Sequence, residues 1–329
     1  MKEIRLGTIG SGEIVCNILD GVSRTDGIFL EAVYSRNEEK GRALASLYGA
    51  EKVYTALEAM LADPDINFIY IASPNILHYP QTRQALLAGK NVICEKPFCT
   101  KASQARELAE LAKEKGLMLV EAVPTTYLPN FAPLKDALSR IGQVRLVLGN
   151  YTQYSSRYDR FLAGEVTNVF NPDFAGGTLM DINYYNIYLT LALFGKPMSA
   201  FYRANMQENG IDTSGVALLS YPGFAASLAG SKDARGESFY QIEGEKGCIY
   251  IKNGPNGLEE LRVAASDKEE IINLQPDPSR WYYEIQNLTP ILLREDHNAI
   301  SEHMELTMNV VELVEKLRQW AGIYFPGDE

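Results

Sequence analysis

The sequence predicts an α/β protein in which a doubly wound parallel sheet precedes an α+β region with a large, mainly antiparallel, open sheet. Short apolar segments alternate with helical segments over the first third of the chain, and longer alternating strands separated by Gly, Pro and Asp follow from residue 144. With 329 residues, the chain also exceeds what one hydrophobic core usually supports. We therefore expect two domains.

The N-terminal region repeats strand–helix units, which lead to a parallel sheet. Strands are expected at 4–9, 30–34, 53–54, 66–72, 91–94 and 117–120, and helices from about 14, at 38–48, after 55, at 79–88 and at 102–114. Gly49, Gly89 and Gly116 suit the left-handed ends of three of these helices. Thr55 and Glu58 have the spacing of a capping box, which predicts a helix start at that point.

The pattern changes near residue 123, so the predicted domains are residues 1–122 and 123–329. Strands are expected in the second domain at 144–154, 200–206, 216–221, 224–230, 239–243 and 248–252, with helices at 184–194 and about 299–319. Apolar and polar residues alternate along these strands, which is typical of an antiparallel sheet with one exposed face.

Composition argues against several classes of protein. The formal net charge of -11 disfavours nucleic acid or an anionic membrane as the main partner, because both require basic surfaces. The four cysteines have no paired spacing, which indicates a reduced, cytoplasmic chain without a disulfide framework or zinc site. With three histidines, no metal site is expected. No targeting segment is visible, and no apolar run reaches the roughly 20 residues that span a membrane.

A glycine turn joins the first predicted strand to the first helix. Gly10 permits the tight turn, Gly12 lets the backbone approach a pyrophosphate, and the helix N-terminus supplies amides. The predicted dinucleotide contacts are Gly10, Ser11, Gly12, Glu13 and Ile14. Val15 fills the third small-residue position, so the turn alone is also compatible with an ordinary strand–helix connection.

Ser35 and Arg36 end the second predicted strand, where an Asp or Glu would indicate NAD. A hydroxyl and a guanidinium suit a 2′-phosphate, so NADP is favoured over NAD. Arg36 has two other interpretations: a solvated loop charge, or stacking on adenine without selection for the phosphate.

Two further turns follow the predicted strands at 66–72 and 91–94, at the sheet edge where open α/β proteins bind ligands. The first turn contains Ser73, Pro74, Asn75 and His78, and the second contains Glu95, Lys96 and Pro97. His78 either lines a cofactor pocket or caps the next helix. Lys96 either stabilises a developing alkoxide or is a surface lysine.

Together these motifs resemble those of the glucose–fructose oxidoreductase/inositol dehydrogenase (Gfo/Idh/MocA) family. The N-terminal motifs are Gly10-Ser11-Gly12, Ala72-Ser73-Pro74-Asn75 with His78, and Ala88-Gly89-Lys90-Asn91-Val92 leading to Glu95-Lys96-Pro97. The C-terminal motifs, similar to the branch of dimeric dihydrodiol dehydrogenases and sugar dehydrogenases, are Tyr154-Ser155-Ser156-Arg157-Tyr158, Gly176-Gly177-Thr178-Leu179-Met180-Asp181 with Tyr185, and residues 318–323. The resemblance covers essentially the whole chain.

The resemblance implies an NAD(P)-dependent oxidoreductase with an N-terminal Rossmann domain and a C-terminal domain for substrate binding and oligomerisation. Lys96 matches the catalytic lysine, Glu95 the residue near the nicotinamide ribose, and the peptide before Pro97 is expected to be cis. Asp181 matches the motif aspartate and Tyr185 the acid/base. A tyrosine has an ordinary pKa near 10, and a nearby ammonium such as that of Lys96 would lower it.

The implied reaction transfers a hydride between nicotinamide C4 and a carbinol carbon of a cyclic polyol, sugar or trans-dihydrodiol. Arg157, Tyr158 and Phe161, together with Asp181, are expected to shape the substrate pocket, although Arg157 equally suits a surface ion pair. A homodimer or homotetramer through the open sheet is expected. The alternatives are a sensor that binds NADP(H) without turnover and an enzyme that retains and recycles bound NAD.

Two positions depart from the pattern of the relatives. Asn183 stands where they usually have glycine, and Thr126 where they commonly have arginine. Both are expected near the substrate pocket, so the identity of the substrate stays open.

Overall fold

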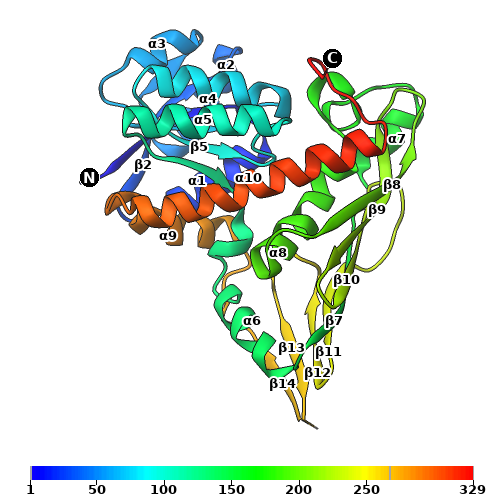
Figure 1. Ribbon diagram of the computed structural model, residues 1–329. Coiled ribbons are helices and arrows are strands. Elements are labelled where there is room, and N and C mark those ends of the chain that lie inside the picture. Colours follow the sequence, from blue (N-terminus) through cyan, green and yellow to red (C-terminus); the bar gives the residue numbers. More distant parts are fainter. Residues whose placement is uncertain (1, 267, 329) are drawn as a thin grey trace. The chain divides into compact units, whose positions relative to one another are not determined.

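A computed structural model describes residues 2–266 and 268–328 (Figure 1). These residues form two compact units. The first unit contains the chain up to Tyr127 together with Ser279–Met308, and the second contains Leu128–Pro278 together with the chain from Asn309 onward.

The first unit is built on a six-stranded parallel sheet with the order β3-β2-β1-β4-β5-β6. Its strands are β1 (Ile4–Ile9), β2 (Ile28–Tyr34), β3 (Lys52–Tyr54), β4 (Phe68–Ile71), β5 (Asn91–Glu95) and β6 (Leu119–Ala122). All four residues of β4 are buried, as expected for a parallel strand covered on both faces. The strand order reverses between β1 and β4, which is where ligands bind in such sheets.

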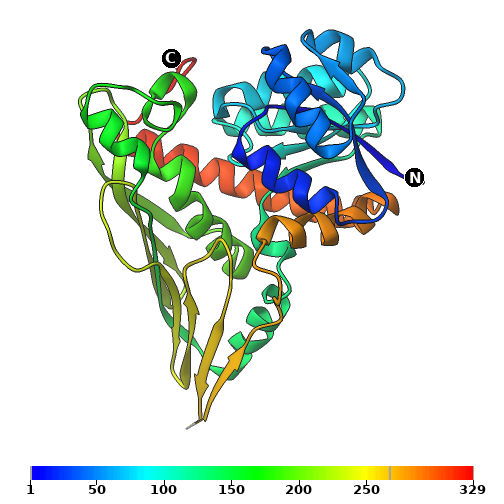
Figure 2. The same ribbon diagram turned by 180° about the vertical axis from the view of Figure 1, so that it is seen from behind.

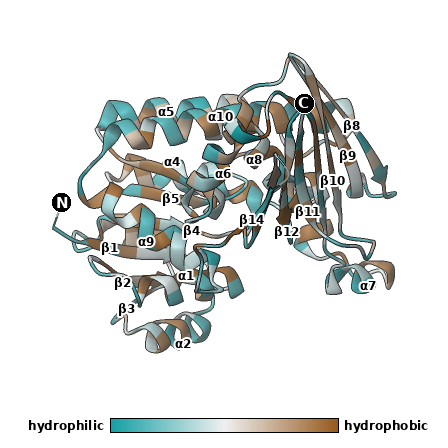
Figure 3. Cartoon of the chain, turned by 90° about the horizontal axis from the view of Figure 1, so that it is seen from below, coloured by the Kyte–Doolittle hydropathy of each residue, from teal (hydrophilic) through white to brown (hydrophobic). Residues whose placement is uncertain are grey.

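Amphipathic helices cover this sheet. They are α1 (Glu13–Val22), α2 (Glu38–Tyr48), α3 (Leu57–Ala62), α4 (His78–Leu87), α5 (Ala102–Lys115), α9 (Arg280–Leu293) and the first half of α10 (His297–Trp320), with short turns η1 (Asn75–Leu77) and η2 (Pro124–Tyr127). The hydropathy colours of Figure 3 alternate along α5, which buries Ala105, Leu108 and Ala112. Helix α4 packs against α5.

The three predicted glycine helix ends are confirmed, and the predicted helix start at Thr55 is wrong. Gly89, which follows α4, has φ of 76°. Gly49 and Gly116 cap α2 and α5 in the left-handed conformation, with φ of 77° and 65°. The capping box is not formed, because α3 begins at Leu57 and its N-cap is Ala56, which has no side-chain hydrogen bond to offer. Thr55 therefore lies one residue too early for its hydroxyl to reach the first-turn amides.

The first unit includes a return segment that the division at residue 122 assigned to the second domain. Helix α9 packs against α1, and Figure 2 shows the two side by side in orange and blue. Ile285, Leu288 and Leu292 of α9 join the same hydrophobic core as Ile4 and Ile18. This contact joins residues more than 250 positions apart, so local periodicity carries no sign of it.

The second unit is built on an eight-stranded sheet with the order β14-β13-β12-β11-β7-β10-β9-β8. Its strands are β7 (Val144–Thr152), β8 (Ser199–Met206), β9 (Asp212–Tyr221), β10 (Phe224–Ser231), β11 (Phe239–Gly244), β12 (Gly247–Lys252), β13 (Leu261–Ala265) and β14 (Lys268–Ile272). All neighbouring pairs are antiparallel except β7 and β10. The predicted fold class is confirmed, and β13 and β14 extend the sheet beyond the six expected strands.

Helix α8 lies on one face of this sheet and contacts β7 and β10 (Figure 1). The helical segments of the second unit are α6 (Phe131–Ala137), η3 (Leu138–Arg140), α7 (Ser156–Leu162), η4 (Asn168–Phe170), η5 (Pro172–Phe174), the π-helical turn η6 (Leu179–Asn183), α8 (Tyr184–Phe194) and the second half of α10. The bounds of α8 agree with the predicted helix at 184–194. None of the helices in residues 2–266 and 268–328 combines the length and apolar character that crossing a membrane requires.

Candidate active site

The glycine turn leaves the N-terminus of α1 open. Gly10 has φ of 119°, and a Cβ there would lie 2.7 Å from the carbonyl oxygen of Ala72, so only glycine fits. Gly12 is the N-cap, has no neighbouring atom within 4 Å of an added Cβ, and leaves α1 without a side-chain cap. The first-turn amides, which start at Glu13 and Ile14, therefore lack a side-chain partner and suit a pyrophosphate.

Ser35 and Arg36 are adjacent in the chain but differ in their environment. Ser35 is buried, and its hydroxyl oxygen accepts a hydrogen bond of 3.3 Å from the amide of Asn37, which in turn caps α2. Arg36 is exposed at the same turn. The serine therefore shapes the turn, and the arginine is the side chain that a 2′-phosphate could reach.

His78 connects the two turns at the carboxyl edge of the sheet. Its ring nitrogens lie 2.9 Å from the carbonyl oxygen of Ser73 and 2.9 Å from that of Pro97. Burial lowers the pKa of His78, so the neutral ring donates to one of these carbonyls. The alternative that His78 caps a helix is not observed, because its ring bonds to the loops rather than to the amides of α4.

The turn before α4 is otherwise held by side chains of its own segment. The hydroxyl of Ser73 donates a hydrogen bond of 2.6 Å to Gln81, and the amide of Leu77 bonds to the carbonyl oxygen of Pro74 at 2.8 Å. Asn75 begins the turn η1. This packing presents the Ser73–Asn75 segment at the carboxyl end of β4.

Glu95 and Lys96 stand at the carboxyl end of β5. Glu95 accepts hydrogen bonds from the hydroxyl of Tyr70 and, at 3.2 Å, from the amide of Lys96. Burial raises the pKa of Glu95, while its hydrogen bond to Tyr70 and the positive charge of Lys96 oppose that shift. The peptide between Lys96 and Pro97 is cis, as the resemblance implied.

A second buried carboxyl group, that of Glu284 on α9, lies close enough to Glu95 for the charge of Glu95 to raise the pKa of Glu284. Glu284 is 1% exposed, and neither of its carboxyl oxygens has a hydrogen-bond partner among the described residues. Burial, with the nearby Glu95 as a further cause, raises the pKa of Glu284 well above its ordinary value. Sequence analysis missed this residue, because a glutamate in an amphipathic helix looks like a solvated one.

In the second unit, Asp181 lies in the π-helical turn that leads into α8. Such turns often occur at functional sites. The fully buried Asp212 of β9 fixes this turn by accepting hydrogen bonds from the amide of Leu179 at 2.8 Å and from the hydroxyl of Tyr202 at 2.7 Å. Asp181 itself forms an ion pair with Lys232, a buried lysine that follows β10 and that sequence analysis missed.

Tyr185 occupies the first turn of α8 and is 7% exposed, whereas its neighbours Tyr184 and Tyr188 are fully buried. Its ring meets that of Tyr151 edge-on, with 5.9 Å between the ring centroids. Tyr184 and Tyr188 stack on each other at 6.5 Å. Tyr185, which the motif spacing singled out, is therefore also the one tyrosine of α8 that keeps some exposed surface among the described residues.

Asn183, which departs from the family pattern, packs inside the second unit. It is fully buried, and its side-chain amide donates a hydrogen bond of 3.1 Å to the carbonyl oxygen of Leu228. A Cβ on Gly230 would lie 2.8 Å from the Cβ of Asn183. Because Gly230 on β10 has no side chain, there is room for the side chain of Asn183 at this contact. In relatives with glycine in place of Asn183, the room would come from that glycine instead. Thr126 lies in η2 of the first unit.

Three of the four residues expected to shape the substrate pocket, Arg157, Tyr158 and Phe161, lie on α7, which has no buried residue. The ring of Phe170 lies 5.7 Å from Tyr158 and 5.2 Å from Phe161. Arg157 is exposed and forms no ion pair with the residues that the structure describes. The alternative of a surface ion pair is therefore not observed within this unit.

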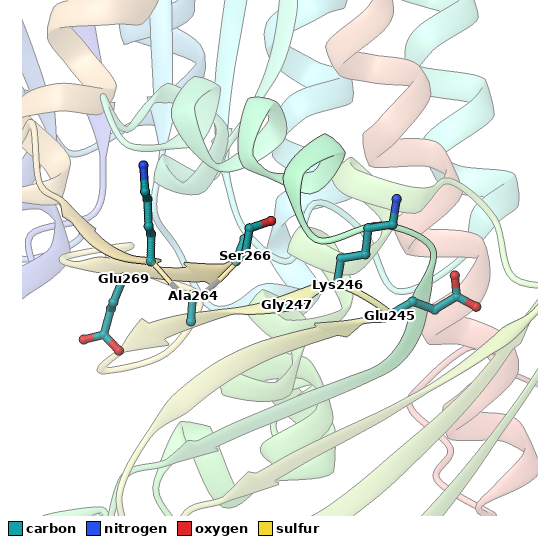
Figure 4. A pocket seen from close by; sticks show the side chains of 8 residues that line it. Glu245, Lys246, Gly247, Ala264, Ser266 and Glu269 are labelled. Carbon is teal, nitrogen blue, oxygen red and sulfur yellow. The ribbon is translucent and has the colours of Figure 1, made fainter.

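The described residues do not meet the requirements of a metal site, and one pocket is lined by residues other than those discussed above. In the described ranges 2–266 and 268–328, no group of three His, Cys, Asp or Glu side chains is arranged to hold a metal ion. A pocket at the hairpin tips of the second sheet is wide open and is lined by Glu245, Lys246, Gly247, Ala264, Ala265, Ser266, Lys268 and Glu269 (Figure 4).

A parallel sheet with an uncapped glycine turn and polar side chains at its carboxyl edge is the arrangement of a dinucleotide-binding domain. Comparison with known proteins specifies this class further. The chain belongs to the GFO/IDH/MocA oxidoreductase family: residues 4–123 match its NAD-binding Rossmann fold and residues 135–250 match its C-terminal domain.

Full-length relatives include enzymes with different substrates. The chain is 35% identical to scyllo-inositol 2-dehydrogenase (NADP(+)) of Bacillus subtilis, covering 99% of both chains. It is 26% identical to trans-1,2-dihydrobenzene-1,2-diol dehydrogenase of Macaca fascicularis, covering 91% of this chain and 90% of that one. The fold matches a 3-ketoreductase from Actinomadura kijaniata, solved with NADP and TDP-benzene, with a TM-score of 0.85, 24% identity and coverage of 96% and 97%.

Proposed function

We propose that this enzyme uses NADP to transfer a hydride to or from a carbinol carbon of a cyclic polyol, sugar or trans-dihydrodiol. The observation that carries the proposal is the retention of Lys96 at the carboxyl end of β5 and of Tyr185, the least buried tyrosine of α8, in a chain 35% identical to an NADP-dependent inositol dehydrogenase. A sensor would need neither proton transfer nor stabilisation of an alkoxide.

The residues of the first unit fit the cofactor. The uncapped amides of α1 suit its pyrophosphate, and the open space at Gly12 admits it. Arg36 would bind the 2′-phosphate and Glu95 a ribose hydroxyl, with further contacts from the Ser73–Asn75 turn. NADP supplies the hydride acceptor when bound, and NADPH the donor.

The chain's own groups handle the proton. We assign Tyr185 as the group that takes the proton from the substrate hydroxyl during oxidation and returns it during reduction. The ammonium of Lys96 would stabilise the oxygen as it gains negative charge and favour the phenolate of Tyr185. Asp181, together with Arg157, Tyr158 and Phe161 of α7, would bind the hydroxyl groups and the ring of the substrate.

Two further assignments belong to the proposal. A homodimer or homotetramer is supported by Phe201, Val216 and Leu218, which are 39%, 36% and 51% exposed on β8 and β9 of the open sheet. A cytoplasmic location is supported by four cysteines that are all free thiols.

The test is formation of NADPH with scyllo-inositol, other inositols, sugars and trans-dihydrodiols, with NAD assayed in parallel. Turnover of at least one substrate, with a preference for NADP, is the expected result. Tight binding of NADPH without turnover of any substrate would instead support a sensor. Purified protein that retains NAD and, without free cofactor, oxidises an added alcohol while reducing an added ketone would support an enzyme that recycles its cofactor.

A further inference from the structure

The ion pair between Lys232 and Asp181 is buried on one side only. The side chain of Lys232 is 7% exposed, whereas that of Asp181 is 31% exposed. A buried ammonium is costly unless it is paired, and Asp181 supplies the pairing carboxylate. The lysine is therefore enclosed by protein, while ligands can still reach the aspartate.

Both ends of this ion pair are tied to the same backbone carbonyl of β9. The amide of Lys232 donates to the carbonyl oxygen of Thr213 at 2.9 Å, and the hydroxyl of Thr178 donates to that oxygen at 2.7 Å. Thr178 immediately precedes the π-helical turn that carries Asp181. The loop after β10 and the turn before α8 thus have a common anchor.

Lys232 also contacts the segment that carries α7. Its carbonyl oxygen accepts a hydrogen bond of 3.0 Å from the amide of Ser155, and the hydroxyl of Ser155 caps α7. The residue therefore joins the turn of Asp181 to the helix that presents Arg157 and Tyr158.

We infer that Lys232 is a positioning residue for the proposed reaction: it holds Asp181 in place as an anion and balances its charge next to Tyr185. This inference rests on the proposed role of Tyr185. Asp181 and Tyr185 are four residues apart across the junction of η6 and α8, about one helical turn, so they lie on the same side. An unbalanced carboxylate there would oppose formation of the Tyr185 phenolate.

Other charged or titratable groups surround the pair from each neighbouring strand. Tyr151 of β7 contacts the ring of Tyr185, and the bonded pair Asp212 and Tyr202 lies behind the π-helical turn. Asp233 follows Lys232 and accepts hydrogen bonds from Ser214 and Ser231. Lys232 forms an ion pair with Asp181 in this unit, so replacing it with an uncharged side chain removes one positive charge at this position.

The experiment compares Lys232→Met with Lys232→Arg, and uses Lys196→Met as the control. Lys196 pairs with Glu312 in the same unit, but 55% of its side chain is exposed. Ionisation of Tyr185 is measured from tyrosinate absorbance against pH, as the difference between each protein and its Tyr185→Phe counterpart. Activity against pH is measured with NADP and the fastest substrate of the panel.

Lys232→Met is expected to move the Tyr185 titration and the alkaline limb of kcat upward by roughly one pH unit, with kcat near neutral pH falling about tenfold. Lys232→Arg should restore both, and Lys196→Met should change neither. An unmoved titration in a folded Lys232→Met protein would overturn the inference, as would an equal shift in Lys196→Met. The tyrosinate measurement needs no turnover, so it decides this inference even if the wild-type protein is inactive, a result that would count against the proposed function alone.

Discussion

The two units present their polar residues by different means. In the first unit, these residues lie on turns at the carboxyl ends of β1, β2, β4 and β5, where the parallel sheet brings them to one edge. In the second, Asp181 and Tyr185 lie on one π-helical turn and the helix that follows, held by buried side chains such as Asp212 and Asn183. Parallel topology gathers the first set automatically, whereas the second set depends on individual buried hydrogen bonds.

The largest expected effect tests whether α8 carries the proton-transfer group. Tyr185→Phe should lower kcat by about 10²–10⁴-fold, because the acid/base hydroxyl is lost, while the affinity for NADPH changes little. Stopped assays of kcat and titration of NADPH fluorescence measure the two quantities. Tyr188→Phe is the matched control on the same helix, since Tyr188 is fully buried. Equal losses of kcat in both variants would contradict the assignment.

The next effect tests the turn after β5. Lys96→Met should lower kcat by about 10²–10³-fold through loss of charge stabilisation at the substrate oxygen. Lys90→Met, in the same unit, removes an ammonium that donates hydrogen bonds to the carbonyl oxygens of Asp63 and Ile66. It should lower thermal stability and leave kcat of the folded protein nearly unchanged. If the two variants had the same kcat, Lys96 would have no special role.

The third prediction compares how the stability of the two units changes as the pH is lowered. His303 of α10 bonds to the carbonyl oxygen of Glu121 at 2.9 Å, and burial lowers its pKa to about 4 from an ordinary 6.5. Between these values the unfolded chain binds more protons at this residue than the folded one, so the contribution of His303 to stability falls as pH falls from 6.5 towards 4. The raised pKa values of Glu95 and Glu284 act in the opposite direction. We expect a loss on the order of 2 kcal/mol.

Hydrogen exchange at pH 7 and pH 5 measures this difference. Amides of β6, which contains Glu121, should lose protection in acid more than amides of β10 in the second unit. His303→Gln should flatten the dependence on pH. Equal loss of protection in both strands would show that His303 does not set the acid limit of the first unit.

The smallest expected effect concerns cofactor choice. Arg36→Leu should reduce the ratio of kcat/KM for NADP over NAD by roughly tenfold, the value of one charge-assisted hydrogen bond to an exposed phosphate. Arg42→Leu is the control, because Arg42 is exposed on α2 and pairs with Glu38. An unchanged ratio in Arg36→Leu would favour the interpretation that Arg36 only stacks on adenine.

Most of the first unit could be predicted from the sequence, because its signals are local. The strand starting at Ile4, the glycine turn and the glycines that end α2 and α5 each follow from a few neighbouring residues. The Glu95-Lys96 turn was placed correctly at the end of β5. The prediction of a capping box at Thr55 and Glu58 was wrong because the motif requires Thr55 to be the N-cap. The helix begins one residue later, with Ala56 as its N-cap.

Side chains that depend on distant partners could not be predicted. Lys232 looks like an ordinary loop lysine until Asp181, 51 positions away, is placed beside it. Glu284 looks solvated until α9 packs against α1. The fit of Asn183 against Gly230 on β10 is likewise visible only in three dimensions.

The sequence by itself therefore determined the alternation of strands and helices in the first unit and the glycine turn, because short-range periodicity and spacing encode them. It singled out Lys96 and Tyr185 only through the resemblance of their motifs to those of the family. Only the tertiary structure decided which buried groups surround those residues. The physical reason is that a buried charge or amide is stable only with a partner, and the fold supplies that partner from another strand or helix. Asp212 beneath the π-helical turn and Lys232 beside Asp181 are the two clearest cases.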